Sequence, residues 1–227
     1  MIDTIERAEC RIYVACLASY NSGRLHGTWI DLDGKEESEV WNEINDMLAR
    51  SPEPNVMRRK CPDCGTYQTD ARPYRENSET CGECGETLPE EFSPSAEEWA
   101  VHDHEGFAGL ITSEWPDIGE VVQMAEILGG DDEDAHRGLV YLVSCLGYSV
   151  ADAVDKAEDV RTYDGRPEDY AAEFYEDCYS DALQAMPDFL RYHIDWEGVA
   201  RDLLLGGDIT EVEEGGERYL VTNASEF

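Results

Sequence analysis

RIYVACLASYNSGRLHGTWIDL, residues 11–32, sets the start of the fold. Two β-rich runs, Arg11–Leu17 and Gly27–Leu32, flank a polar turn at residues 21–23, and their separation is too wide for a two-residue hairpin loop. The next run, Val40–Arg50, places apolar residues at helical spacing. We therefore expect the chain to open with two strands followed by a helix.

Residues 51–94 differ in composition from the sequence on either side. They contain six of the nine prolines and both Cys-x-x-Cys pairs. The run Trp99–His104 that follows is typical of a short strand. We interpret residues 51–94 as an insertion, called the insertion below, after which Trp99–His104 resumes the N-terminal sheet.

Four cysteines in the insertion have the spacing of a tetrahedral zinc site, Cys-x2-Cys-x16-Cys-x2-Cys. A glycine follows each pair and gives the backbone the freedom that a ligand turn needs. We expect one structural Zn²⁺ per chain, because the insertion has few apolar residues with which to form a core. A redox role is the alternative, but neither pair stands at the start of a helix that follows a strand. The expected ligands are Cys61, Cys64, Cys81 and Cys84.

The other four cysteines, Cys10, Cys16, Cys145 and Cys178, stand in apolar surroundings and are expected to be buried free thiols. The basic run Arg58–Lys60 permits a contact either with acidic residues of the same protein or with nucleic acid. The sequence leaves both open.

Helical patterns dominate the second half of the chain. Helices are expected over residues 118–128, 135–146, 150–159, 168–185 and 196–204, with a late strand over residues 218–221. The fold class is thus α+β. At this length one large domain or two to three small ones are possible, and small domains in a row would be elongated. For three domains the expected bounds are residues 1–117, a sheet and helix interrupted by the zinc-ribbon-like insertion; residues 118–160, acidic and helical; and residues 161–227, acidic and α+β.

Charge is the most unusual property of the composition. The chain has 52 Asp and Glu against 17 Lys and Arg, a formal net charge of -35, yet 41% of it is hydrophobic. Such a field repels nucleic acid and anionic membranes and attracts basic proteins, while the hydrophobic content is enough for a folded core. The opening MIDTIERAEC lacks the apolar stretch of a secretory signal, and Gly138–Val150 is too short to cross a bilayer. We expect a cytoplasmic protein that does not bind membranes.

An acidic row runs along the helix expected at residues 168–185. Its members, Asp169, Glu173, Asp177 and Asp181, follow one another at intervals of four residues. This spacing corresponds to a rise of about 6 Å, whereas duplex DNA carries one charge per about 1.7 Å of its axis. Imitation of DNA therefore needs several acidic elements side by side. A solvated face, or an acid coat suited to high salt, is the simpler explanation, and the presence of only three lysines supports it.

No catalytic motif accompanies this charge. The chain has no phosphate-binding glycine loop, nucleophile elbow or zinc-protease helix. His102 and His104 could place two imidazoles on one face of a strand, but no third ligand stands at a fixed spacing from them. We expect a protein that is not an enzyme.

Several segments, in order, resemble the ArdA-type antirestriction proteins. RIYVACLASYNSGRLHGTWIDL resembles the opening of that family, and WAVHDHEGF with PDIGEVVQMAEIL resembles the entry to its central helices. LVYLVSCLGYSVADAVDKAEDV is similar to its antirestriction motif, and YHIDWEGVARDLLLGGDI to its final segment. The insertion has no counterpart in this resemblance, and Tyr163–Gln184 matches only in acidity and aromatic placement.

The resemblance implies a curved homodimer of elongated, three-domain chains whose carboxylates imitate bent B-form DNA. Such a protein occupies the DNA-binding groove of type I restriction-modification enzymes, turns over no substrate, and does not itself bind DNA through its acidic surface. We call the carboxylates assigned to this role the mimic set. It comprises Asp131, Asp132, Glu133, Asp134, Asp152, Asp155, Glu158, Asp159, Asp169, Glu173, Glu176, Asp177 and Asp181.

Two other functions stay open at this stage. One is a zinc-ribbon adaptor, in which the insertion grips a protein or nucleic acid and the acidic remainder is a halophilic, solubilising surface. The other is a metalloenzyme centred on His102 and His104.

Overall fold

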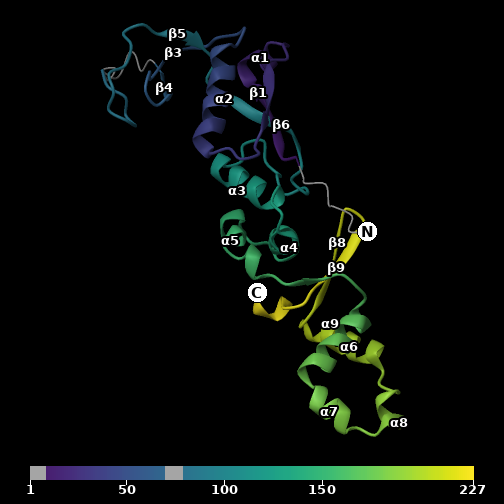
Figure 1. The fold of residues 1–227 in the computed structure, drawn as a ribbon. Coiled ribbons are helices and arrows are strands. Elements are labelled where there is room, and N and C mark those ends of the chain that lie inside the picture. The colour runs from purple at the N-terminus through teal and green to yellow at the C-terminus, as the bar shows by residue number, and fades with distance from the viewer. Residues whose placement is uncertain (1–8, 70–78) are drawn as a thin grey trace. The chain divides into compact units, whose positions relative to one another are not determined.

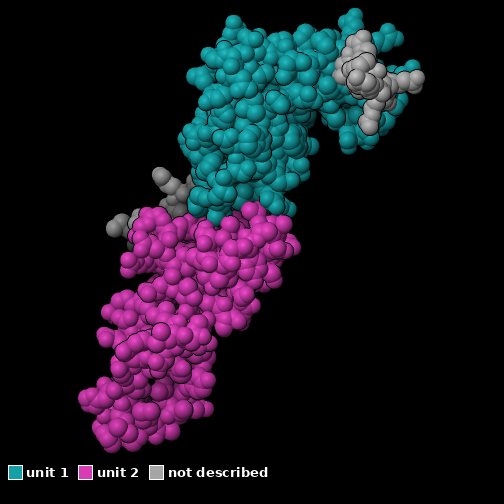
Figure 2. Space-filling view, turned by 180° about the vertical axis from the view of Figure 1, so that it is seen from behind, with its two compact units in different colours: residues 1–131 teal, residues 132–227 magenta. Residues whose placement is uncertain are grey.

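A computed structural model describes residues 9–69 and 79–227 of the chain. It divides into two compact units, residues 1–131 and residues 132–227 (Figure 2). Residues 70–78 of the insertion lie outside the described ranges. We describe each unit by itself.

The first unit is built on a three-stranded antiparallel sheet of order β2-β1-β6 (Figure 1). Its strands are β1 (Arg11–Cys16), β2 (Gly27–Asp31) and β6 (Trp99–Glu105). A short helix, α1 (Leu17–Asn21), fills part of the wide connection between β1 and β2. The pairing of β6 with β1 confirms that the sheet resumes beyond the insertion.

Helix α2 (Glu37–Ala49) packs against β1 and β2 through a buried stripe, Val40, Ile44, Met47 and Leu48. A capping box starts the helix. The Glu36 side chain accepts from the backbone N–H of Glu39, and the Glu39 side chain accepts from the backbone N–H of Glu36. Helix α3 (Ile118–Leu128) packs on α2 with its own buried stripe. The side chain of Asp117 caps α3 by accepting from the N–H of Glu120.

The insertion forms a separate three-stranded sheet of order β4-β3-β5. Its strands are β3 (Val56–Lys60), β4 (Tyr67–Thr69) and β5 (Ser93–Ser95). The backbone N–H of Ala96 donates to the carbonyl of Leu48 at 3.0 Å. The sheet is thereby joined directly to the end of α2.

The second unit begins with helical segments that differ from the expected ones. α4 (Glu133–Val140) continues as a π-helical turn, η1 (Tyr141–Cys145), so the expected helix 135–146 is only partly α-helical. α5 (Val150–Val154) is followed by a 3₁₀ turn, η2 (Ala157–Asp159), in place of one helix over 150–159. α4 packs closely on η2, since a Cβ added at Gly138 would meet the carbonyl oxygen of Ala157 at 2.3 Å.

A small sheet of order β7-β9-β8 follows, made of β7 (Thr162–Tyr163), β8 (Thr210–Glu214) and β9 (Glu217–Val221). Helix α6 (Pro167–Cys178) packs against α9 (Trp196–Gly206), and each contributes one buried alanine, Ala171 and Ala200. The remaining elements are α7 (Ser180–Ala185), α8 (Asp188–Arg191) and η3 (Ala224–Glu226).

The single helix expected over residues 168–185 is wrong. α6 ends at Cys178, Tyr179 leaves the helical region with φ -128° and ψ 27°, and α7 begins at Ser180. The acidic row is therefore divided, with Asp181 on a different helix from Asp169, Glu173 and Asp177.

Two of the four remaining cysteines are also misplaced by the sequence interpretation. Cys10 and Cys16 are buried as expected, but Cys145 and Cys178 are exposed. Cys145 is the last residue of η1 and Cys178 the last of α6, so both lie where a helix stops and its packed face ends.

The structure groups α3 with the first unit, whereas the sequence interpretation begins a central domain at residue 118. The three-domain division stays a prediction. Within the part of the chain that the structure describes, no helix is both long and apolar enough to cross a membrane.

Candidate metal centre and acidic surface

The four cysteines of the insertion come together as a cluster. Their sulfurs all lie within 4.8 Å of one another; Cys61 and Cys84 are 3.6 Å apart, and Cys64 and Cys81 are 3.5 Å apart. Four thiolates at about 2.3 Å from a tetrahedral Zn²⁺ lie about 3.8 Å from each other. The donor set and its spacing therefore fit a tetrahedral metal ion.

Two matching turns present the four sulfurs. In the first, Cys61 N–H donates to Thr66 O at 2.8 Å and Gly65 N–H donates to Cys61 O at 3.2 Å. In the second, Cys81 N–H donates to Glu86 O and Gly85 N–H to Cys81 O, at 2.7 and 2.9 Å. Gly65 and Gly85 have φ of +76° and +77°, which a side chain would disfavour. The sequence predicted this role for both glycines.

The cluster replaces a hydrophobic core in this part of the chain. Cys61 and Cys81 are buried together with Leu88, whereas Cys64 and Cys84 are exposed. Hydrogen bonds with Thr66 lower the pKa of Cys64 to about 6, which favours its thiolate form. Since thiolates are the metal-binding form, this favours coordination.

The basic residues of β3 contact their own protein. Arg59 donates to Pro89 O at 3.0 Å and to Gln68 Oε1 at 3.1 Å, and its guanidinium lies 4.7 Å from the Phe92 ring centre. Arg58 stacks over Tyr67 at 5.2 Å. Lys60 Nζ pairs with Asp46 of α2 at 2.8 Å. Of the two contacts that the sequence left open, the structure shows the one within the protein.

Asp46 fixes the insertion to α2. Besides Lys60, its carboxylate accepts from the Tyr67 hydroxyl at 2.7 Å. Burial raises the pKa of Asp46, but the hydrogen bonds from Lys60 and Tyr67 and the charges of Lys60 and Arg50 outweigh burial and lower it. Because the pKa of Asp46 is lower in the folded than in the unfolded chain, its ionised carboxylate stabilises the folded state. This stabilisation is present above an ordinary aspartate pKa of about 3.9 and is lost as pH falls through the lowered value.

We expect Asp46→Asn to loosen the insertion without releasing its metal. The loss should be about 1 kcal/mol or less, because Lys60 and Asp46 are both more than two-fifths exposed. Hydrogen exchange should quicken in β3 and β4 while the metal content stays the same. Glu43→Gln is the matched control, since it removes an equal charge from α2 but pairs with Lys35. Equal exchange in both variants would contradict the docking role of Asp46.

All members of the mimic set are exposed. Several also have structural tasks, however. Asp132 caps α4 by accepting from Ala135 N–H, Asp134 accepts from Thr162 N–H at 3.1 Å, and Asp152 accepts from the Ser149 hydroxyl at 2.6 Å. Two further members are ion-paired: Glu133 with Arg137, and Asp169 with Arg166.

The sequence did not predict the basic residues of α4, Arg137 and His136, as partners of acidic side chains. The side chain of Arg137 is only 12% exposed, pairs with Asp164 at 2.9 Å as well as with Glu133, and stacks over Tyr219 at 4.7 Å. His136 Nε2 lies 2.9 Å from Glu214. Glu214 and Tyr219 are about eighty residues away along the chain, so no local pattern signals these pairs.

The histidine pair does not form a metal site in the described ranges. His102 packs edge-on against Tyr20 at 4.9 Å, and His104 against Phe107 at 6.0 Å. Among residues 9–69 and 79–227, the four cysteines are the only group of three or more metal-binding side chains. The hypothesis of a metalloenzyme centred on the two histidines has no further support.

Comparison with known proteins decides the family. The sequence model of one family, described as antirestriction protein (ArdA), matches residues 12–218, nearly the whole chain. The chain belongs to the ArdA family. ArdA proteins are a non-catalytic antirestriction family, which implies an interaction with restriction-modification enzymes. Among the curated proteins, none matches this chain.

Proposed function

We propose that this ArdA protein inhibits type I restriction-modification enzymes by presenting carboxylates where those enzymes expect the phosphates of duplex DNA. The observation that carries the proposal is the formal charge of -35 with every member of the mimic set exposed. A target groove that binds DNA is basic, so a surface of this sign competes for it, and repulsion keeps the acidic surface itself from binding DNA.

The structural tasks of the mimic set refine which carboxylates carry this function. Asp132, Glu133, Asp134, Asp152 and Asp169 are engaged in hydrogen bonds or ion pairs within the chain. Of the other members, seven form no ion pair within residues 132–227: Asp155, Glu158, Asp159, Glu173, Glu176, Asp177 and Asp181. We assign the larger share of binding to these, because their charge is free to meet a cationic partner.

The same proposal includes a protein without catalytic activity that works as a cytoplasmic homodimer, as family resemblance implies. The four-cysteine cluster holds one structural Zn²⁺ per chain, through Cys61, Cys64, Cys81 and Cys84. Zinc would fix the two turns and supply no reaction chemistry, since all four tetrahedral positions are taken by protein.

The competing function, a zinc-ribbon adaptor with a merely solubilising acidic surface, needs a free contact face on the insertion. Arg59 and Lys60 instead bind Pro89, Gln68 and Asp46. These contacts disfavour a nucleic-acid grip by β3.

The proposal is tested by adding the purified protein to a type I restriction enzyme that is cleaving unmodified DNA. We expect cleavage to stop at low salt and to recover as salt is raised. A type II enzyme on the same DNA serves as the control and should continue to cut. Undiminished type I cleavage at saturating protein would contradict the proposal.

A further inference from the structure

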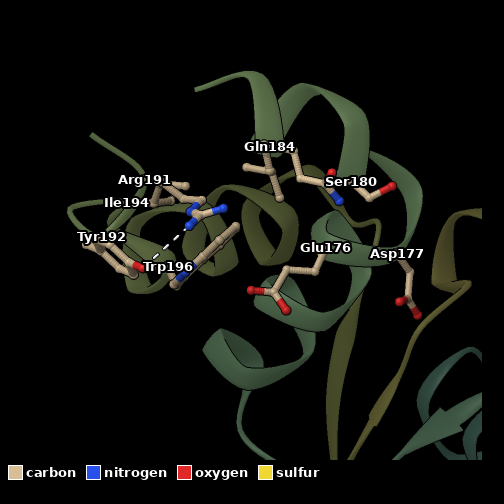
Figure 3. A pocket seen from close by; sticks show the side chains of 9 residues that line it. Glu176, Asp177, Ser180, Gln184, Arg191, Tyr192, Ile194 and Trp196 are labelled. Carbon is tan, nitrogen blue, oxygen red and sulfur yellow. Dashed lines mark hydrogen bonds between the residues drawn. The ribbon is translucent and has the colours of Figure 1, made fainter. Parts of the chain in front are cut away.

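A cavity of about 670 Å³ opens among α6, α7, α8 and α9 in the second unit (Figure 3). Its walls are both acidic and aromatic: Glu176 comes from α6, Tyr192 follows α8, and Trp196 begins α9. In Figure 3 the Glu176 side chain extends toward the side of the cavity where Trp196 lies, whereas Asp177 points away. The volume is within the range of sites that bind a ligand or a peptide side chain.

The cavity presents one carboxylate, Glu176, that is not engaged in an ion pair. Arg191 is the cation on its wall, and this guanidinium is already paired with Asp188 at 3.1 Å and hydrogen-bonded to the Tyr192 hydroxyl at 3.4 Å. Within residues 132–227, all of which the structure describes, Glu176 has no ion pair. The charge of Glu176 contributes, after Tyr192 and Asp188, to raising the pKa of Arg191, yet the Glu176 carboxylate is not in direct contact with that guanidinium. An added cation can therefore bind the Glu176 carboxylate directly.

The aromatic side chains define which cation fits. Trp196 is held in place by Tyr175, with ring centres 6.2 Å apart, and Tyr192 is 75% exposed at the opening. Arg191 lies over the Tyr192 ring at 5.3 Å, so a guanidinium already packs on this wall. A planar guanidinium can stack on an aromatic ring and bind a carboxylate with two parallel hydrogen bonds, which an ammonium cannot.

Exposed apolar side chains on α8, the helix that carries Arg191 of the cavity wall, favour a protein segment as the ligand. Phe189 and Leu190 of α8 are 70% and 50% exposed, and α7 and α8 contribute no buried residue. Duplex DNA offers no counterpart to such apolar side chains on its phosphate surface. A polyamine or free metabolite would leave them uncovered, whereas a protein segment could cover them.

We propose that this cavity binds an arginine side chain of the target protein, with its guanidinium between Glu176 and Trp196 and its apolar neighbours on Phe189 and Leu190. The role in inhibition rests on the proposed function; the binding of a guanidinium does not. The cavity adds a specific binding site to a surface that otherwise imitates phosphates. The apolar contacts with Phe189 and Leu190 are less sensitive to salt than the ionic ones.

The experiment titrates the full, metal-loaded chain with the capped peptide acetyl-Leu-Arg-Leu-amide and follows the indole N–H of Trp196 by NMR. The same peptide with citrulline in place of arginine keeps the shape and lacks the charge. We expect the arginine peptide to shift Trp196 and the citrulline peptide to bind about tenfold more weakly or worse. Equal binding of both peptides would overturn the proposal.

Two variants distinguish specific binding in the cavity from general electrostatic attraction to an acidic protein. Glu176→Gln and Asp181→Asn each remove one carboxylate, but Asp181 does not line the cavity. We expect about a tenfold loss of affinity in the first and less than twofold in the second. Equal losses would mean diffuse electrostatics and would overturn the proposal.

A second copy of this chain is the rival occupant. Sedimentation of the wild type and of Glu176→Gln and Tyr192→Ala tests it, and an unchanged oligomeric state is expected. Dissociation of a dimer by either variant would overturn the assignment to a target protein. These measurements use no restriction enzyme. If guanidinium binding fails, the proposed antirestriction function is not contradicted, and if the antirestriction function fails, the guanidinium site is not contradicted.

Discussion

Replacing Cys61 and Cys64 by serine will release the metal and unfold the insertion, while the β2-β1-β6 sheet and the second unit stay folded. Binding of structural zinc to short peptides is worth about 10–16 kcal/mol, more than the buried Cys61, Cys81 and Leu88 could replace. The sheet should survive because β6 pairs with β1 independently of the insertion. Metal analysis should show the loss of one ion per chain, and amide exchange should become fast across β3, β4 and β5 only.

The control for this change is the double variant Cys145→Ser and Cys178→Ser, which removes two exposed thiols outside the cluster. It should keep both the metal and slow exchange. We also expect the Cys61 and Cys64 variant to inhibit restriction within about twofold of the wild type, a difference of less than 0.5 kcal/mol. Lost inhibition in a chain whose second unit is still folded would instead favour the zinc-ribbon adaptor.

Neutralising Glu173, Asp177 and Asp181 together will weaken inhibition about tenfold at low salt, if each exposed charge contributes about two- to threefold. None of the three forms an ion pair within residues 132–227, all of which the structure describes. The change to Gln and Asn keeps size and removes only charge. Inhibition curves at several salt concentrations give the measurement, and the difference from wild type should shrink as salt rises.

The matched control removes equal charge from the insertion, through Asp63→Asn, Glu83→Gln and Glu90→Gln, all exposed. We expect little effect on inhibition. A halophilic acid coat would make the two triple variants equivalent, because only total charge would matter. Equivalence would therefore contradict the assignment of the function to the helices of the second unit.

Local sequence signals predicted the parts of the fold that local chemistry determines. The spacing of the cysteines and the two following glycines anticipates the metal cluster, because each ligand turn is complete within six residues. The β-forming residues of Trp99–His104 predict a strand that returns to the N-terminal sheet after the insertion. The caps at Ser149 and Asp117 are equally local, since each side chain accepts from a backbone N–H in the first turn of its own helix.

The remaining features depend on contacts that the sequence does not display. The break at Tyr179 falls in a run without glycine or proline, where helical periodicity continues on both sides. The structural tasks of Asp134 and Glu214 depend on partners far along the chain, Thr162 and His136. The cavity that Glu176 lines exists only because four helices meet there, so no local pattern in the sequence predicts it.

Competition for a single binding site tests the central claim most directly. Labelled duplex DNA bound to a type I methyltransferase complex is titrated with this protein, from low to physiological salt, and the bound DNA is followed by fluorescence anisotropy. We expect complete displacement at low salt, and an apparent affinity that falls steeply as salt increases. A ternary complex of enzyme, DNA and this protein, or DNA that stays bound at saturating protein, would contradict the claim that the carboxylates take the place of DNA.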